Sequence, residues 1–327
     1  MKIPRRRFLQ LAGGAVSAPA FPQLALALDY PVRPVHIVVG FPAGGVTDLG
    51  ARILGEWLSA RLNQPFVIEN KPGASTQIAA EAVVRASADG YTLLMASSTN
   101  AINVALYGKR NYDFIHDIAP VASVMHFPLV LVVHPSVPVK TVPELISYAK
   151  ANSGQINLAS FGTGTGSHLA GELFKMMAGI KMVHVPYRGS APMLVDLLGG
   201  QVQAAFDNLP SSIEYIRAGK LRALAVTTAT RLDALPDVPA LSETLPGYAA
   251  SAWIGIGAPA NTPTDIIATL NKEINAGLLD PQIKAKVANL SAVVLAGSPA
   301  DFGKLIADDV AKWTNVIQTA DIKPEQG

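Results

Sequence analysis

The stretch that decides the fold runs from Val35 to Leu62 and reads VHIVVGFPAGGVTDLGARILGEWLSARL. Val35 to Val39 is a short run rich in β-branched residues, which predicts a buried strand. Asp48 to Leu62 has the length and the apolar spacing of an amphipathic helix. The glycine-rich turn from Phe41 to Asp48 joins the two and completes the first half of a βαβ unit. We therefore predict an α/β protein.

The same alternation of short apolar runs and longer amphipathic segments continues along the chain, as expected of βαβ units. We expect further strands at residues 67–69, 92–96, 157–160, 183–185, 204–206 and 221–227. We expect further helices at residues 77–86, 142–151, 167–178 and 191–198.

Two long apolar stretches, Val121 to Val133 and Ala252 to Ala258, bracket one complete set of these units. The first is interrupted by Pro128. This arrangement predicts two lobes with a ligand cleft between them and two crossing strands that join them: a discontinuous first lobe, residues 28–125 plus 253–327, and an inserted second lobe, residues 126–252. Helices near 263–278, 281–289 and 299–319 each begin near a proline, which suits a first helical turn. We expect this helical tail to pack onto the first lobe with no further strand.

The first 27 residues have the pattern of an export signal. Lys2 and Arg5-Arg6-Arg7 precede an apolar stretch, and Ala25-Leu26-Ala27 predicts cleavage after Ala27. The arginines followed by Phe8 and Leu9 resemble the twin-arginine (Tat) signal, although ordinary Sec export remains open. A buried N-terminal helix is the alternative, but glycines and prolines interrupt the segment. We expect a periplasmic protein, soluble after cleavage.

The charge composition gives no reason to expect a nucleic acid or an anionic membrane as partner, and no later apolar run is long enough to predict insertion into a membrane. The predicted signal holds four of the 26 Lys and Arg and none of the 24 Asp and Glu, so the remainder carries a formal charge of −2. The absence of cysteine excludes disulfides, zinc–thiolate sites and thiol nucleophiles. The six histidines show no i,i+4 pairing. We therefore expect neither a metal nor a cofactor.

Two loops that each lie between a strand and a helix, one in each predicted lobe, favour an anionic ligand, because free N–H groups and the helix dipole meet at a helix start. The first spans Phe41 to Asp48, and Thr47 or Asp48 could instead cap the helix. The second spans Ser160 to His168 and alternates glycine with hydroxyl residues, but it lacks the spacing of a dinucleotide loop. A smaller loop, Pro72 to Gln77, also precedes a helix and could line the same cleft, but taken alone it is better explained by a plain N-cap at Ser75 or Thr76.

Two further strand ends supply polar candidates, because ligands of α/β sheets bind at such an edge. Arg188 follows the strand at 183–185 and could pair with a ligand carboxylate. Asp207 follows the strand at 204–206 and could accept from a ligand amine or orient a loop. An ion pair within the lobe or a simple turn is the alternative for each residue.

Evidence for catalysis is weak. Ser147 and Lys150 match the S-x-x-K spacing, but neither S-D-N nor K-T-G accompanies it. An exported serine hydrolase that uses Ser147, or a serine near the glycine loops, stays an alternative to a binding protein. A ligand sensor for a signalling partner is another alternative. We expect a protein that is not an enzyme.

Six motifs in order resemble the Bug-type receptors of tripartite tricarboxylate transporters. They are Pro31-Val32-Arg33-Pro34, Phe41-Pro42-Ala43-Gly44-Gly45-x-Thr47-Asp48, Glu69-Asn70-Lys71-Pro72-Gly73-Ala74, Asp89-Gly90-Tyr91-Thr92-Leu93-Leu94, Val185-Pro186-Tyr187-Arg188-Gly189 and Phe206-Asp207-Asn208. The resemblance implies a type II periplasmic-binding fold. It also implies a monomer that delivers a di- or tricarboxylate, an acidic amino acid or an aromatic acid to the membrane subunits of a transporter.

The resemblance and the loops together define the predicted ligand-binding residues: Phe41, Ala43, Gly44, Thr47, Asp48, Ser75, Thr76, Gln77, Thr163, Gly164, Thr165, Ser167, His168, Arg188 and Asp207. One segment departs from the family pattern. The chain has Ser75-Thr76-Gln77-Ile78-Ala79 where the family usually has Gly-Gly-Asn-Ile-Gly. We expect this change to shrink the pocket or to add hydrogen-bond donors to it.

Overall fold

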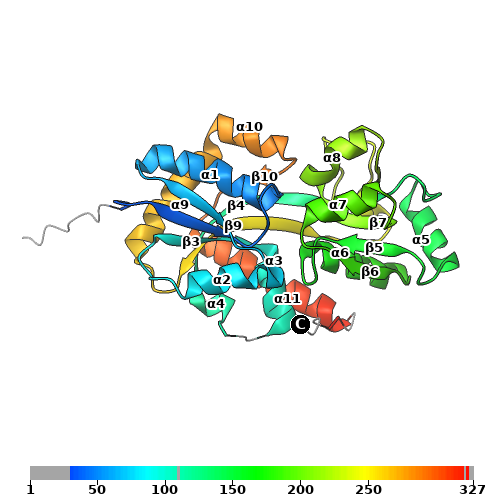
Figure 1. Cartoon of the computed structure of the whole chain (residues 1–327), viewed down its shortest axis with the longest axis horizontal. Helices are drawn as coiled ribbons and strands as arrows, with labels where there is room; N and C mark the ends of the chain where they lie inside the picture. Colours follow the sequence, from blue (N-terminus) through cyan, green and yellow to red (C-terminus); the bar gives the residue numbers. More distant parts are fainter. Residues whose placement is uncertain (1–29, 109–110, 320–321, 324–327) are drawn as a thin grey trace, which may run out of the picture.

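The computed structural model describes residues 30–108, 111–319 and 322–323, so the predicted signal at residues 1–27 lies outside the described part. The protein has two α/β halves side by side, with β4 (Ile118–Val133) and β9 (Ser251–Pro259) running between them (Figure 1). The strands follow the order β2-β1-β3-β9-β4-β7-β5-β6, with β8 and β10 also paired with β4. Within the described residues, no helix has both the length and the apolar character needed to cross a membrane.

The first sheet consists of parallel strands at its outer side and antiparallel strands toward the middle of the molecule. The central strand β1 pairs in parallel with β2 and β3, and β3 pairs antiparallel with β9. Its strands are β1 (Val35–Val39), β2 (Phe66–Asn70) and β3 (Thr92–Ser97), together with β9, the first part of β4, and β10 (Val293–Val294). Its helices are α1 (Val46–Leu62), α2 (Gln77–Val84), α3 (Ser98–Tyr107), α4 (Phe114–Asp117), α9 (Thr264–Leu279) and α10 (Pro281–Asn289), with a 3₁₀ turn η2 (Ala74–Thr76) before α2.

The second sheet is formed by the last part of β4 and by strands from the inserted segment. Strand β5 pairs in parallel with β6 and β7, while β7 and β8 pair antiparallel with β4. Its strands are β5 (Asn157–Ser160), β6 (Val183–Pro186), β7 (Ala204–Asn208) and β8 (Arg222–Val226). Its helices are α5 (Val142–Ala151), α6 (Gly166–Ala178), α7 (Ser190–Leu198) and α8 (Leu209–Arg217), with a short 3₁₀ helix η3 (Leu241–Glu243).

Strand β4 belongs to both sheets. Its residues from Ile118 to Pro128 pair with β9, and Leu129 to Val133 pair with β7 and β8. The predicted interruption at Pro128 is wrong, because the strand continues through this residue. Pro128 is the last residue paired with β9, at the point where β4 changes partners, a position that tolerates a residue without an N–H donor. The predicted lobe boundaries at 125/126 and 252/253 fall inside β4 and β9 and stay predictions.

The C-terminal segment differs from its prediction in two ways. Strand β10 follows α10 and pairs with Met125 and His126 of β4, so the expectation of no further strand is wrong. Two residues are too few to produce a recognisable periodicity. The last helix, α11 (Pro299–Thr319), packs against both halves. Phe302 lies in a cluster with first-sheet residues, whereas Trp313 lies in the core of the second sheet.

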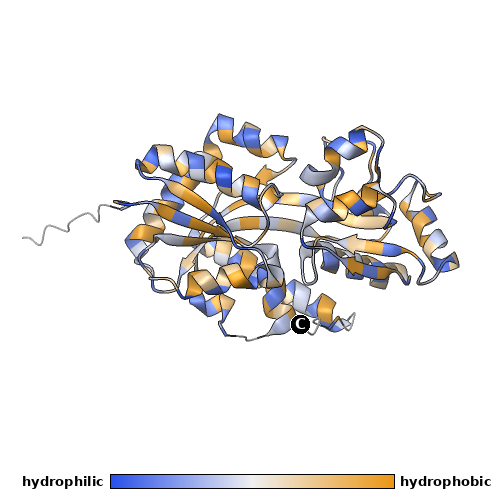
Figure 2. Ribbon diagram, in the orientation of Figure 1, coloured by the Kyte–Doolittle hydropathy of each residue, from blue (hydrophilic) through white to orange (hydrophobic). Residues whose placement is uncertain are grey.

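Hydrophobic residues are concentrated where the sheets meet their helices. Figure 2 shows helices that mix hydrophilic and hydrophobic residues along the outside of both sheets. One apolar cluster fills the first half around Ile37 and Leu93, and another fills the second half around Leu131 and Phe206. Phe41 packs against both clusters. The β1–α1 loop is therefore the point at which the two cores approach each other.

Gly255 in β9 tests the close packing of the crossing strands. A Cβ atom there would lie 2.4 Å from Phe302 Cζ and 2.7 Å from the carbonyl oxygen of Ala122. We expect Gly255→Ala to lower the free energy of unfolding by about 1–3 kcal/mol in urea denaturation, as overpacking does. Gly303→Ala in α11 is the control, since its Cβ would meet nothing closer than 3.4 Å and alanine favours a helix. Equal stability of the two variants would contradict the packing described.

Candidate functional site

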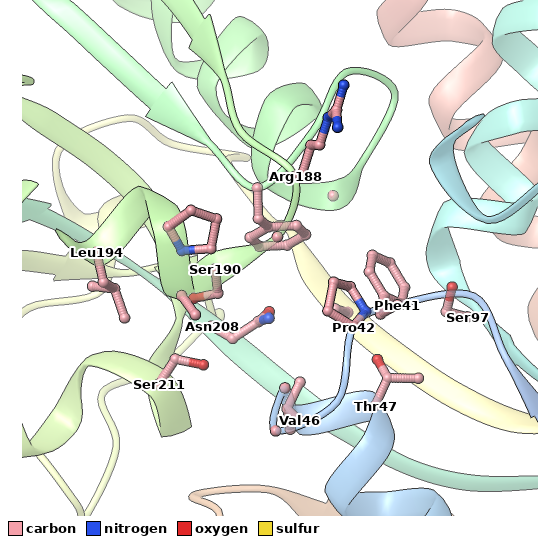
Figure 3. Close-up of a pocket in the computed structure, with 18 of the residues that line it drawn as sticks. Phe41, Pro42, Val46, Thr47, Ser97, Arg188, Ser190, Leu194, Asn208 and Ser211 are labelled. Atoms are coloured by element: carbon pink, nitrogen blue, oxygen red, sulfur yellow. The ribbon is translucent and has the colours of Figure 1, made fainter. Parts of the chain in front are cut away.

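A cavity of about 350 Å³ lies between the two sheets (Figure 3). This volume is at the small end of the range for small-molecule sites, which is about 300–1,000 Å³. The first half contributes the β1–α1 loop, the start of α3, the middle of β4 and the start of β9. The second half contributes the β6–α7 loop, α7 and the start of α8. The polar or glycine residues of the wall are Gly44, Gly45, Thr47, Ser97, Ser98, Thr99, Gly166, Arg188, Gly189, Ser190, Asn208, Ser211 and Tyr215.

Several helices begin at this cavity. Helices α1, α7 and α8 start after Gly45, Gly189 and Asn208, and no side chain caps any of the three. By contrast, α5, α6 and α10 have their first N–H groups satisfied by Thr141, Thr165 and Asp280. The first turn of a helix carries a partial positive charge and unpaired N–H groups. The cavity is therefore lined by neutral hydrogen-bond donors suited to an anion.

Asp48 fixes the shape of the β1–α1 loop from behind. Its carboxylate accepts hydrogen bonds from the Gly44 N–H, Arg52 Nε and Asn70 Nδ2, each at 2.9 Å. Asn70 Nδ2 also donates to the Phe41 carbonyl oxygen at 3.1 Å. Burial alone would raise the pKa of Asp48, but these donors lower it overall. Asp48 is 1% exposed and lies outside the cavity wall, so its observed contacts are those of a positioning residue.

Three contacts join the halves around the cavity. The rings of Phe41 and Phe161 meet edge to face with their centroids 6.5 Å apart. Pro42 lies against Gly189, where an added Cβ would be 3.5 Å from Pro42 Cγ. The Ser75 hydroxyl donates to the Thr163 carbonyl oxygen. The β1–α1 and β2–α2 loops of the first half thus contact the β5–α6 and β6–α7 loops of the second.

The β2–α2 loop has a strained backbone and does not line the cavity. Ala74, Ser75 and Thr76 have φ angles of 44°, 50° and 72°, and each such left-handed residue costs about 1–2 kcal/mol when it is not glycine. Hydrogen bonds hold the segment in place, because Asn103 Nδ2 donates to the Ser75 carbonyl at 2.6 Å and Asn100 Nδ2 donates to Thr76 Oγ1 at 3.0 Å. No side chain of this segment caps α2.

Several polar side chains of the β5–α6 loop bond to neighbouring protein groups, whereas Thr163 Oγ1 is buried with no hydrogen-bond partner in the described structure. Thr165 Oγ1 donates to the Gly162 carbonyl at 2.6 Å and caps α6, while the Ser167 hydroxyl donates to the Phe206 carbonyl. His168 Nδ1 accepts from the Gly164 N–H at 3.1 Å, and its ring stacks on that of His184 at 4.0 Å. Burial, and next the neighbouring His168, lower the pKa of His184 to about 3. Within this loop, Phe161 and Gly166 line the cavity.

Asp207 lies behind the cavity and reaches it through Ser190. The carboxylate is completely buried and accepts from Ser190 Oγ at 2.5 Å and Ser212 Oγ at 2.6 Å. Burial raises the pKa of Asp207 to about 6, against the opposing effect of these hydroxyls. The neighbouring Asn208 lines the cavity and has a buried Oδ1 with no hydrogen-bond partner in the described structure.

The structure brings five of the predicted ligand-binding residues to the cavity wall: Phe41, Ala43, Gly44, Thr47 and Arg188. The others lie outside the wall: Asp48, Ser75, Thr76, Thr163, Gly164, Thr165, Ser167, His168 and Asp207, together with Gln77, which lines a second cavity beside α3 and α4. The family departure at Ser75 to Gln77 therefore does not change the wall of the cavity between the sheets. The role of each residue toward a ligand stays a prediction.

Polar wall residues that the sequence analysis missed lie next to positions it considered. Ser97 to Thr99 follow the strand predicted at residues 92–96, and Ser190 and Asn208 follow Arg188 and Asp207 closely. The rule that ligands bind beyond the carboxyl ends of parallel strands would have found them. Among the described residues, no group of three or more His, Asp or Glu side chains is arranged to hold a metal ion.

The two-half fold and the donor-lined cavity between the halves define a solute-binding protein with the type II periplasmic-binding fold. Comparison with known protein families supports this class, since the family model described as "Tripartite tricarboxylate transporter family receptor" matches residues 51–322. The chain belongs to this family of receptors.

Individual relatives show the same likeness over nearly the whole chain. BugT of Bordetella pertussis is 36% identical over 320 residues, covering 97% of this chain and 98% of BugT. A protein from R. palustris solved with adipate is 40% identical, with a TM-score of 0.87, covering 90% of this chain and 100% of that one. MatC from Rhodopseudomonas palustris, solved with bound malate, is 32% identical, with a TM-score of 0.83 and coverage of 88% and 100%.

The raised pKa of Asp207 predicts a specific pH dependence of stability. The folded state holds the proton of the Asp207 carboxyl group more tightly than the unfolded chain, in which the pKa of this group is 3.8. The free energy of unfolding of the wild type should therefore fall, relative to Asp207→Asn, as the pH rises from about 4 to about 6. Over this pH range, the free energy of unfolding of the wild type should fall by up to about 3 kcal/mol relative to that of Asp207→Asn.

Urea denaturation at several pH values measures this difference. Asp301→Asn provides a control of opposite sign, because hydrogen bonds from Ser298 lower the pKa of Asp301. The free energy of unfolding of the wild type should therefore rise relative to that of this variant as the pH rises. A wild-type minus Asp207→Asn difference that does not vary between pH 4 and 6 would contradict the assignment.

Proposed function

We propose that this receptor captures a small carboxylate in the cavity between its sheets and delivers it to the membrane subunits of a tripartite transporter. The observation that carries the proposal is the meeting of three uncapped helix starts, those of α1, α7 and α8, at one cavity. The relatives solved with adipate and with malate bind carboxylates, which supports the same ligand chemistry here.

The proposed binding mechanism depends on the N–H and hydroxyl groups that are free to donate hydrogen bonds to a ligand in the cavity. The loop that begins α1 is held by Asp48, so its backbone is fixed before a ligand arrives. The N–H groups at the starts of α1 and α7 and the hydroxyl of Thr47 face the same cavity from opposite halves. A carboxylate bridging them contacts both halves at once. The ligand therefore favours the arrangement in which the halves approach each other, since it binds that state more tightly.

The protein is proposed to be a receptor without catalytic activity. Ser147 and Lys150 are exposed on α5, away from the cavity. The described residues that line the cavity include several serines but no His, Asp, Glu or Lys. The carboxylate that contacts the wall serine Ser190 is that of Asp207, which is completely buried and also accepts from Ser212. This composition supports binding over hydrolysis.

Location and assembly follow from the same proposal. We infer that residues 1–27 direct export and are removed near Ala27, so that the receptor acts in the periplasm as a monomer. The basic, apolar and small-residue regions of this segment support export. The family match supports a membrane partner for the liganded receptor.

A charge introduced at the start of α1 tests the carboxylate site. Gly45 is the N-cap of α1, has extended backbone angles, and would hold a Cβ with no atom closer than 3.8 Å. In Gly45→Asp the new carboxylate takes the N–H groups and the positive potential that the ligand needs, while remaining a good helix cap. We expect at least tenfold weaker binding of acids that raise the melting temperature of the wild type.

Gly45→Asn is the matched control, because asparagine has the same size and capping ability without the charge. The measurement is thermal shift, then calorimetric titration, against a panel of mono-, di- and tricarboxylates and their uncharged amides. The proposal fails if the amides stabilise the wild type as well as the acids do, or if no acid of the panel binds.

A further inference from the structure

Helix α7 has apolar residues on two faces, and only one of these faces is covered by protein. Met193, Leu194 and Leu197 are buried in the core of the second sheet. Ala191, Val195 and Leu198 line the cavity instead. Leu194 contacts the core and also lines the cavity. Together with Leu194, the lining positions are spaced i, i+3, i+4 and i+7, so they form one continuous stripe along the helix. We call these four residues the α7 stripe.

The α7 stripe leaves apolar surface open in the cavity. Val195 is 69% exposed, and Leu198 is partly exposed. Tyr215 of α8 and Pro42 of the β1–α1 loop extend the same apolar wall. Covering such a surface is favourable by roughly 25 cal/mol per Å² of apolar area. A ligand with an apolar body would gain this free energy, whereas a compact polar ligand would leave the stripe exposed to water.

The cavity wall offers little positive charge to a second carboxylate of a ligand. Among the described lining residues, Arg188 has the one permanently charged side chain. In Figure 3 its guanidinium group points away from Ser190 and Asn208. The uncapped helix starts and the hydroxyls serve one end of a ligand. The side chains of the α7 stripe carry no donor, and the polar groups beside it on α8, Ser211 and Tyr215, are uncharged. A second carboxylate there would lose hydration without gaining a positive charge, which is costly for a charged group.

We propose that the ligand is an amphipathic monocarboxylate, with its carboxylate at the starts of α1 and α7 and its alkyl or aromatic body along the α7 stripe. This inference rests on the proposed carboxylate-binding function and narrows it to one class of acid. The α7 stripe then determines specificity, and Val195, its exposed large side chain, is the specificity-determining residue.

Octanoate, suberate and octanamide form a matched set of probes for the full-length mature protein. Suberate has the same chain length as octanoate but carries a second carboxylate, and octanamide lacks the charge. By calorimetric titration we expect octanoate to bind at least tenfold more tightly than suberate, and octanamide at least tenfold more weakly than octanoate.

Val195→Lys tests the position of the ligand body. The side chain is largely exposed, so a lysine can be accommodated without disturbing the core. Its ammonium group would pair with a distal carboxylate and oppose an apolar chain. We expect the octanoate-to-suberate preference to fall by at least tenfold or to invert. Val183→Lys on β6 adds the same charge at an exposed valine outside the cavity wall and should leave the preference unchanged.

The outcomes separate this inference from the function on which it rests. Tighter binding of suberate than of octanoate to the wild type, with amides inactive, would overturn the monocarboxylate assignment and leave carboxylate binding intact. An unchanged preference in Val195→Lys would overturn the placement along the α7 stripe. Binding of octanamide as tight as that of octanoate would count against carboxylate recognition itself.

Discussion

Strands β4 and β9 hydrogen-bond to each other from Ile118 to Pro128, and every other strand is arranged around this antiparallel ladder. Because β4 continues into the second sheet, the ladder sets how the two sheets face each other. The close approach of neighbouring elements requires glycine in β9, since a Cβ at Gly255 would strike Phe302 and one at Gly257 would lie 2.5 Å from Ile118 Cγ2. The helix starts that surround the cavity are placed by this central pair.

The proposed site suits an anionic ligand although Arg188 is the one permanently charged side chain among the described residues of its wall. A cluster of lysines would be costly to bury before the ligand arrived, because unpaired charges lose hydration. Helix starts avoid that cost, since their N–H groups are neutral dipoles fixed by the backbone. The same principle accounts for Asp207. Its carboxylate is buried and its pKa is raised, but it is satisfied by Ser190 and Ser212 and does not enter the cavity.

The sequence predicts the order of strands and helices well where hydrophobic periodicity is long and regular, as in α1 and α11. It predicts the β1–α1 loop of the site, because the glycines of this loop stand between a strand and a helix that are both recognisable from the local sequence. It does not show how the Ser167 hydroxyl of the β5–α6 loop is used, because its acceptor, the Phe206 carbonyl, is distant in sequence and lies beside it only after folding. The three left-handed residues from Ala74 to Thr76 are equally unpredictable, since tertiary hydrogen bonds from α3 hold them.

The two halves contribute differently to recognition. The first half supplies a loop whose geometry is locked by Asp48, Arg52 and Asn70, so changes there disturb the backbone donors themselves. The second half presents side chains from one face of α7, whose opposite face already anchors the helix in the core. Residues on the cavity face can therefore change in size and charge while the helix stays in place. A fold built this way can keep one site for a carboxylate and alter the remainder of the ligand through a few positions of a single helix.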